Sequence, residues 1–246
     1  MKIKKVLTFM GIGLMALLIL AAAGLVIWSA TSTYPAGKTA FAALEPSETI
    51  SILQEDWIVL TPEMRTDTGL IFYPGGLVAP EAYAPVLREI AEQGILVVIT
   101  PMPLNLAIFN SNAANAVLEA YPKISTWVLA GHSLGGAAAA IYAEGHPGKI
   151  DALALWDSYP ADSADLSDND LAVLSIYGTT DDIPNTDNFD EKIYLLPADA
   201  LFIALEGASH AQFGDYGPQK GDVTPSISAA EQHALVVEAM LAFINR

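Results

Sequence analysis

Apolar residues are distributed in two different ways along the chain. Residues 6–28 form one apolar stretch without a charged side chain, whereas the rest of the chain alternates short apolar runs with helical patterns. A helix over residues 6–28 would be about 34 Å long, enough to cross a bilayer core of about 30 Å. Lys2, Lys4 and Lys5 precede this stretch. The sequence therefore predicts a membrane anchor with its amino end in the cytoplasm and the body outside.

A cleaved signal peptide is the alternative interpretation of the same segment. Ala21, Ala22 and Ala23 offer small residues of the A-x-A type, and cleavage there would release a secreted protein. The apolar run continues as far as Trp28, which is longer than a signal peptide needs and favours the uncleaved anchor. Residues 29–48 are rich in small and polar types and predict a tether, followed by one domain over 49–246.

The body shows the alternation of an α/β protein. The predicted strands are 50–60, 69–73, 95–100, 126–130, 152–156, 172–177 and 201–205, and the predicted helices are 81–93, 110–121, 135–144, 188–195 and 228–244. Several strands are continuously apolar, as strands covered on both faces should be. We therefore expect a mostly parallel sheet with helices on both faces, and functional residues just beyond the carboxyl ends of its strands.

Charge and composition exclude several functions. The chain has a formal net charge of −17; residues 1–44 carry +4 and residues 45–246 carry 7 − 28 = −21. An acidic body repels phosphates, so no nucleic-acid partner is expected. The chain has no cysteine, and its four histidines show no metal-ligand spacing. We therefore predict neither a disulfide, nor a catalytic thiol, nor a metal or cofactor.

One motif carries chemistry. An apolar strand runs into Gly131-His132-Ser133-Leu134-Gly135, a G-x-S-x-G sequence, and a small-residue helix follows. In this setting the serine occupies a sharp turn that exposes its hydroxyl, and flanking glycines keep the bend free of side chains. Ser133 is the predicted nucleophile.

A serine hydroxyl needs a base, and the base needs an orienting acid. His210 follows the last predicted strand and is the predicted base. Asp181 follows the strand before it and is the predicted acid, because the order Ser…Asp…His then matches a known arrangement. Asp182, its neighbour, and Asp157, at the end of strand 152–156, are the alternatives.

The same reasoning predicts an oxyanion hole and a substrate wall. The backbone amide of Leu134 is one expected donor, and that of Gly76, in the turn Tyr73-Pro74-Gly75-Gly76-Leu77, is the other, with Leu77 next in line. Residues 101–109 follow a strand, and Met102, Leu104 and Phe109 are expected to form an apolar wall for substrate. Helix-facing core is the alternative role of these three side chains.

These stretches resemble the α/β-hydrolase superfamily over residues 50–246. The segments FYPGGLV, ITPMPLNLAIFN, GHSLGG, LWDSYPADSADLS, SIYGTTDD and EGASHAQFGDYG are similar to a short, lidless bacterial group related to dienelactone hydrolases. Dienelactone hydrolases use a cysteine nucleophile, which this chain lacks. The resemblance therefore implies a serine triad of Ser133, Asp181 and His210 and the hydrolysis of a carboxylic ester, but not a dienelactone substrate.

The sequence thus predicts a membrane-anchored serine hydrolase with a small-molecule ester substrate and no cofactor. The short segment between Tyr159 and Leu171 leaves no room for a helical lid, which favours a small acyl or aryl group over a long chain. Two other functions use the same sequence features. One is a non-catalytic binding module that keeps the fold, and the other is an acyltransferase that uses the same triad.

Overall fold

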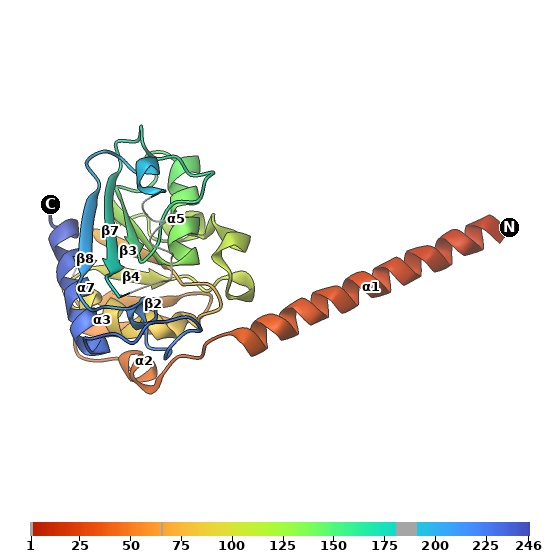
Figure 1. Ribbon diagram of the computed structural model, residues 1–246, viewed down its shortest axis with the longest axis horizontal. Coiled ribbons are helices and arrows are strands. Elements are labelled where there is room, and N and C mark those ends of the chain that lie inside the picture. The colour runs from red at the N-terminus through yellow and green to blue at the C-terminus, as the bar shows by residue number, and fades with distance from the viewer. Residues whose placement is uncertain (1, 65, 181–190) are drawn as a thin grey trace. The chain divides into compact units, whose positions relative to one another are not determined.

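The structure is a computed structural model that describes residues 2–64, 66–180 and 191–246 (Figure 1). It divides the chain into two units, Met1–Thr33 and Tyr34–Arg246. The first unit holds a single helix, α1 (Lys2–Ser32), and its segment Phe9–Ser32 is long and apolar enough to span a membrane. The same properties fit a signal sequence, so α1 agrees with both interpretations of the amino-terminal segment.

The second unit is built on an eight-stranded sheet. Its order is β1-β2-β4-β3-β5-β6-β7-β8, and all neighbours are parallel from β4 to β8. The strands are β1 (Ile50–Gln54), β2 (Ile58–Pro62), β3 (Thr68–Tyr73), β4 (Leu96–Ile99), β5 (Thr126–His132), β6 (Ala152–Trp156), β7 (Ala172–Gly178) and β8 (Leu201–Leu205). The order reverses between β3 and β5. Ligand sites in such sheets lie beyond the strand ends at this reversal.

One predicted strand is wrong in its extent. Residues 50–60 were expected to form one strand, but they form most of an antiparallel hairpin, in which Ile50 pairs with Pro62 and Gln54 with Ile58. The polar turn between the two strands, which contains Glu55 and Asp56, breaks the run. β2 also pairs antiparallel with β4, so the hairpin adds the only antiparallel part among the described strands of the sheet.

Helices cover both faces of the sheet. On one face lie α3 (Ala84–Ala91) and α7 (Ala229–Ile244), which share a core with β3, β4 and β6 side chains. On the other lie α4 (Ala113–Ala120) and α5 (Leu134–Gly145), packed on the alternate side chains of the same strands. Figure 1 shows α7 and α3 to the left of the sheet and α5 to its right. The central strands β3 to β6 thus bury both faces, as their continuous apolar sequences require.

Short 3-10 turns connect these elements. They are η1 (Pro80–Tyr83), η2 (Pro103–Asn105), η3 (Ala107–Asn110), η4 (Ile193–Leu195) and η5 (His210–Phe213). The helix predicted over 188–195 is represented by η4 alone within the described residues. Helix α7 begins where the sequence predicts it, because Ser228 and Glu231 form a reciprocal capping box.

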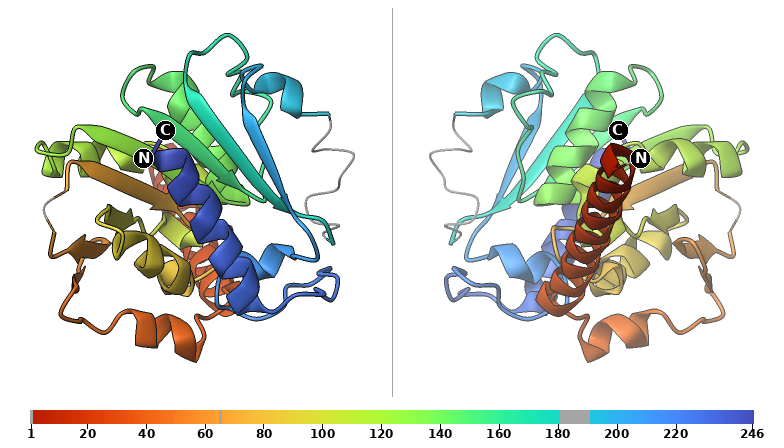
Figure 2. Two further views of the ribbon diagram at one scale, coloured as in Figure 1. Left: turned by 90° about the vertical axis from the view of Figure 1, so that its left-hand side faces the viewer. Right: turned by 90° about the vertical axis from the view of Figure 1, so that its right-hand side faces the viewer.

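Part of the predicted tether is folded. From Tyr34 onward the chain belongs to the second unit, and residues Lys38–Ala43 form a short helix, α2. The Asp215 side chain accepts a hydrogen bond from the Ala40 amide at 2.8 Å, and Ala40 is buried. A segment of small residues predicts a spacer, but here one of its alanines, Ala40, is buried against the domain. Figure 2 shows this amino-terminal part of the domain from two further sides.

Candidate active site

The turn between β5 and α5 is strained at the predicted nucleophile. Ser133 has φ 52° and ψ −123°, a conformation that costs a non-glycine residue about 1–3 kcal/mol. Its amide donates to the Trp156 carbonyl at 3.0 Å, and its own carbonyl accepts from the Ser158 hydroxyl at 2.7 Å. Both partners belong to the end of the neighbouring strand β6 and the residues after it. The adjacent strand therefore holds the turn in its strained form.

The glycines around Ser133 allow neighbouring backbone segments to lie closer than a side chain would permit. A methyl group on Gly131 would lie 2.5 Å from the backbone of Gly135, and one on Gly136 would lie 2.5 Å from the Ser158 hydroxyl. A methyl group on Gly135 would overlap the carbonyl oxygen of Tyr73 at the end of β3. The motif thus lets α5 begin directly against both neighbouring strands.

A buried carboxylate lies at the end of the next strand. Asp157 directly follows β6, has φ 46°, and is 2% exposed. Its Oδ2 lies 2.7 Å from Nδ1 of His210, which is 1% exposed, and its Oδ1 accepts from the Gly178 amide at 3.1 Å. The carboxylate is thus oriented by β7 on one side and faces the imidazole on the other.

Ser133 and Asp157 line one pocket of about 340 Å³, together with Leu134, Ala137, Ser158, Tyr159 and Ala161. His210 contacts Asp157, one of the residues that line this pocket. The structure therefore places the predicted nucleophile and one of the alternative acids on one pocket, and it pairs that acid with the predicted base. The first choice of acid, Asp181, and its neighbour Asp182 lie outside the described residues.

The loop that carries His210 is held by a side chain that the sequence analysis did not single out. Gln232, fully buried on α7, accepts from the Ser209 amide at 3.0 Å and donates to the Ser209 carbonyl at 2.9 Å. Both bonds fix the residue next to the imidazole. The sequence contains a signal for this role, because Gln232 is a polar residue at helical spacing from the apolar residues Val236 and Met240. All three lie on the buried face of α7.

The two predicted oxyanion donors lie close together. A methyl group on Gly76 would lie 3.1 Å from a side-chain carbon of Leu134. As the first residue of α5, Leu134 has an amide without an acceptor inside the helix. The alternative donor, Leu77, has its amide engaged, since it donates to the Asn105 carbonyl at 2.7 Å. Gly76 is therefore the better candidate of the two.

A buried polar network contacts the turn that contains Gly75 and Gly76. The Tyr83 hydroxyl accepts from the Gly75 amide at 2.9 Å and is hydrogen-bonded to Nδ1 of His132 at 2.9 Å. The His132 and His210 rings lie 4.4 Å apart between centroids. Burial lowers the pKa of His132 well below its usual range, with a smaller contribution from His210, and burial raises that of Tyr83. Both groups are therefore neutral at pH 7, and together they join the Gly75–Gly76 turn to the motif.

The predicted substrate wall has a mixed outcome. Met102 is buried in the core that includes residues of α4 and α5. This is the helix-facing core role that was the alternative to a substrate wall. Leu104 has φ 57° and is half-buried, whereas Phe109 is 56% exposed. Leu106, which was not singled out, has a side-chain carbon within 3.6 Å of where a Gly76 methyl group would be. The side chain of this segment that approaches residues 73–77, hereafter the oxyanion turn, is therefore not one of those predicted first.

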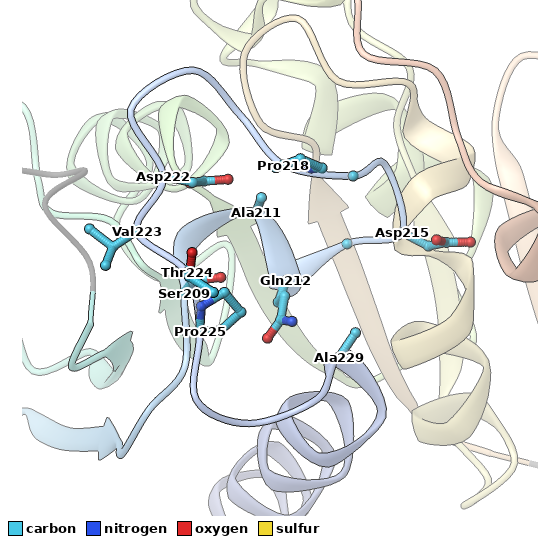
Figure 3. A pocket seen from close by; sticks show the side chains of 12 residues that line it. Ser209, Ala211, Gln212, Asp215, Pro218, Asp222, Val223, Thr224, Pro225 and Ala229 are labelled. Carbon is cyan, nitrogen blue, oxygen red and sulfur yellow. The ribbon is translucent and has the colours of Figure 1, made fainter.

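A second cavity of about 380 Å³ lies beside the histidine loop (Figure 3). It is lined by residues of the 209–229 segment, among them Gln212, Asp215, Asp222 and Thr224. Among the described residues that line it, none belongs to the Ser133 turn. Asp215 serves the fold there, through its bond to the Ala40 amide of α2.

The sheet order, the strained serine turn and the His–Asp pair together define a hydrolase of the α/β class. The chain belongs to the α/β-hydrolase family, whose family model matches residues 69–234. A search of curated proteins gives no match.

Several solved structures share this fold. An esterase from Pyrobaculum calidifontis is 17% identical with a TM-score of 0.59, covering 84% of this chain and 90% of that chain. Est1E from Butyrivibrio proteoclasticus is 13% identical with a TM-score of 0.58, covering 81% and 100%. The esterase domain of a Rhodothermus marinus protein is 18% identical with a TM-score of 0.57, covering 76% and 90%. At these identities the similarity establishes the fold.

Proposed function

We propose that this hydrolase cleaves a carboxylic ester through an acyl-enzyme on Ser133, with His210 as base and Asp157 as the orienting acid. The observation that supports this most directly is the buried contact of 2.7 Å between His210 Nδ1 and Asp157 Oδ2, beside the pocket that Ser133 lines. A carboxylate at Nδ1 holds the imidazole with Nε2 available as the proton acceptor and stabilises its charged form. Asp157 replaces Asp181 as the proposed acid.

The reaction has two halves. Ser133 Oγ attacks the ester carbonyl while His210 Nε2 takes its proton, and the Leu134 and Gly76 amides bind the developing oxyanion. The tetrahedral intermediate collapses, the C–O bond to the alcohol breaks, and His210 gives its proton to the leaving oxygen. Water then attacks the acyl-enzyme with His210 again as base, which releases the acid and restores Ser133. The cycle uses only side chains, backbone amides and water.

The pocket supports a small acyl or aryl group. A volume of about 340 Å³ is at the lower end of ligand-binding cavities. Its walls, which include Leu134, Ala137 and Ala161, are mostly apolar and would accept an uncharged group. We also retain the proposal that α1 anchors the protein, with the catalytic unit on the extracytoplasmic side, as Lys2, Lys4 and Lys5 favour.

The experiment is hydrolysis of p-nitrophenyl acetate by the full chain in detergent, with fluorophosphonate labelling as a second measurement. Ser133→Ala is expected to abolish both, and retained turnover would contradict the nucleophile assignment. The acid is tested by Asp157→Asn, Asp181→Asn and Asp182→Asn in parallel. We expect Asp157→Asn to lower kcat by about 10³–10⁴-fold, and the other two to lower it by less than threefold. The reverse pattern would return the role to Asp181 or Asp182.

A further inference from the structure

Tyr34, the first residue of the second unit, pairs with the turn that carries the proposed oxyanion donor. Tyr34 forms a parallel bridge with Val78: its amide donates to the Leu77 carbonyl at 2.7 Å, and its carbonyl accepts from the Ala79 amide at 3.0 Å. Only Thr33 separates Tyr34 from Ser32, the last residue of α1. Two residues span at most about 7 Å, and paired backbones lie about 5 Å apart. Chain length alone therefore keeps Leu77 within about 12 Å of the end of α1.

The rim beside this turn continues with exposed apolar side chains. The Leu77 amide donates to the Asn105 carbonyl at 2.7 Å, which attaches the 103–110 segment to the same turn. On that segment Ile108 is 51% exposed and Phe109 is 56% exposed. Two large apolar side chains in water are common on a protein surface, but here they lie on the segment that is bonded to the oxyanion turn.

The side of the rim that these segments form is also uncharged, although the body is strongly acidic. Residues 45–246 carry a net charge of −21, yet residues 69–80, 94–118 and 125–143 contain no Asp, Glu, Lys or Arg. These three segments supply the oxyanion turn, the 103–110 segment and the Ser133 turn. Charged side chains on the rim would lose hydration at a lipid surface, and acidic ones would also be repelled by anionic headgroups. An uncharged rim can approach the bilayer at little cost.

We propose that the substrate is an ester carried by a membrane-embedded amphiphile. The apolar part of the amphiphile stays in the bilayer and lies against Ile108 and Phe109, while its small acyl group enters the pocket of about 340 Å³ beside Ser133. Hydrolysis consumes one water and gives a short-chain acid, released to solution, and an amphiphilic alcohol, left in the membrane. This inference rests on the proposed ester hydrolysis and on α1 remaining attached as a membrane span.

The test uses the full chain reconstituted into phosphatidylcholine vesicles that contain hexadecyl acetate, with formation of hexadecanol measured by chromatography. Turnover of p-nitrophenyl acetate by the same vesicles reports the chemistry alone. A spacer of 20 Gly/Ser residues inserted between Thr33 and Tyr34 leaves the Tyr34 bridge in place, but lets the body move about 25 Å from the membrane. We expect the spacer to lower hexadecyl acetate turnover at least fivefold and to change p-nitrophenyl acetate turnover less than twofold.

A matched pair of substitutions tests the rim itself. Ile108→Ser is expected to lower the ratio of hexadecyl acetate to p-nitrophenyl acetate turnover at least threefold. Leu53→Ser, which removes a side chain of similar exposure (50%) from the edge strand β1, should leave this ratio unchanged.

Three results would overturn the inference while leaving ester hydrolysis intact. They are wild-type turnover of p-nitrophenyl acetate but not of hexadecyl acetate, an unchanged rate with the spacer, and recovery of the protein from its host cleaved after Ala23. Absence of turnover with both substrates in the wild-type chain would instead contradict the proposed function.

Discussion

Tyr83→Phe removes one oxygen atom that serves two buried groups. The Gly75 amide and Nδ1 of His132 both lose their partner at 2.9 Å, and the surrounding residues are fully buried. The ring itself stays, with its contact to Phe72 at 4.7 Å between centroids. Leaving a buried polar group unsatisfied costs about 1–3 kcal/mol. With two such groups, we expect the free energy of unfolding to fall by about 2–4 kcal/mol.

The assay is thermal unfolding of the full chain in detergent, followed by near-UV circular dichroism, together with p-nitrophenyl acetate turnover. A loss of 2–4 kcal/mol corresponds to a fall in Tm of about 5–12 °C for a domain of this size. Because Gly75 precedes the proposed oxyanion donor Gly76, we also expect kcat to fall about tenfold at a temperature where the variant is folded.

Tyr142→Phe is the matched control. It removes the same atom from a buried tyrosine whose hydroxyl donates to the Asn115 side chain at 2.8 Å, on the helix side away from the turn. That bond is only part-buried, so the control should lose about 1 kcal/mol or less and keep its kcat. If Tyr83→Phe matched Tyr142→Phe in both Tm and kcat, the network would have no role in holding the turn.

Three further predictions concern the framework of the site. Gly135→Ala should prevent soluble folding because its methyl group overlaps the end of β3, whereas Gly145→Ala on the same helix, with open space around it, should keep or raise the Tm. Gln232→Leu should lower both Tm and kcat, because the histidine loop loses two buried hydrogen bonds; unchanged kcat in the folded variant would contradict this role. Burial lowers the pKa of His233, so the unfolded chain binds the proton first and stability falls as pH drops below about 6.5. In urea titrations at pH 7 and pH 5.5, His233→Gln should lose less stability than wild type on acidification, and equal losses would refute this.

The sheet and the nucleophile could be predicted because each has a local cause. Apolar runs such as 152–156 and 95–100 contain β6 and β4, since strands buried on both faces leave a continuous pattern in the sequence. The Ser133 turn is encoded within five residues, and the glycines show why. The hairpin of β1 and β2 was missed because apolar residues on both sides of a polar turn can be read as one run.

The rest of the site depends on which strands lie side by side. Asp157 and Asp181 both follow apolar strands, and the sequence gives no distance from either to His210. Tyr83 and Gln232 act across the fold, on residues that the chain places 8 and 23 positions away. Nothing local marks such pairs except a polar residue at a buried position. The relation to dienelactone hydrolases and the role of Asp181 as the triad acid stay predictions.

Three adjacent strands each contribute one part of the site, and this ties activity to the alignment of the sheet. Ser133 directly follows β5, Asp157 directly follows β6, and the Gly178 amide at the end of β7 orients the carboxylate. A slip of one residue between any two of these strands would turn a functional side chain to the opposite face. Heating should therefore abolish turnover in the same cooperative transition that melts the sheet, so inactivation and unfolding curves should superimpose.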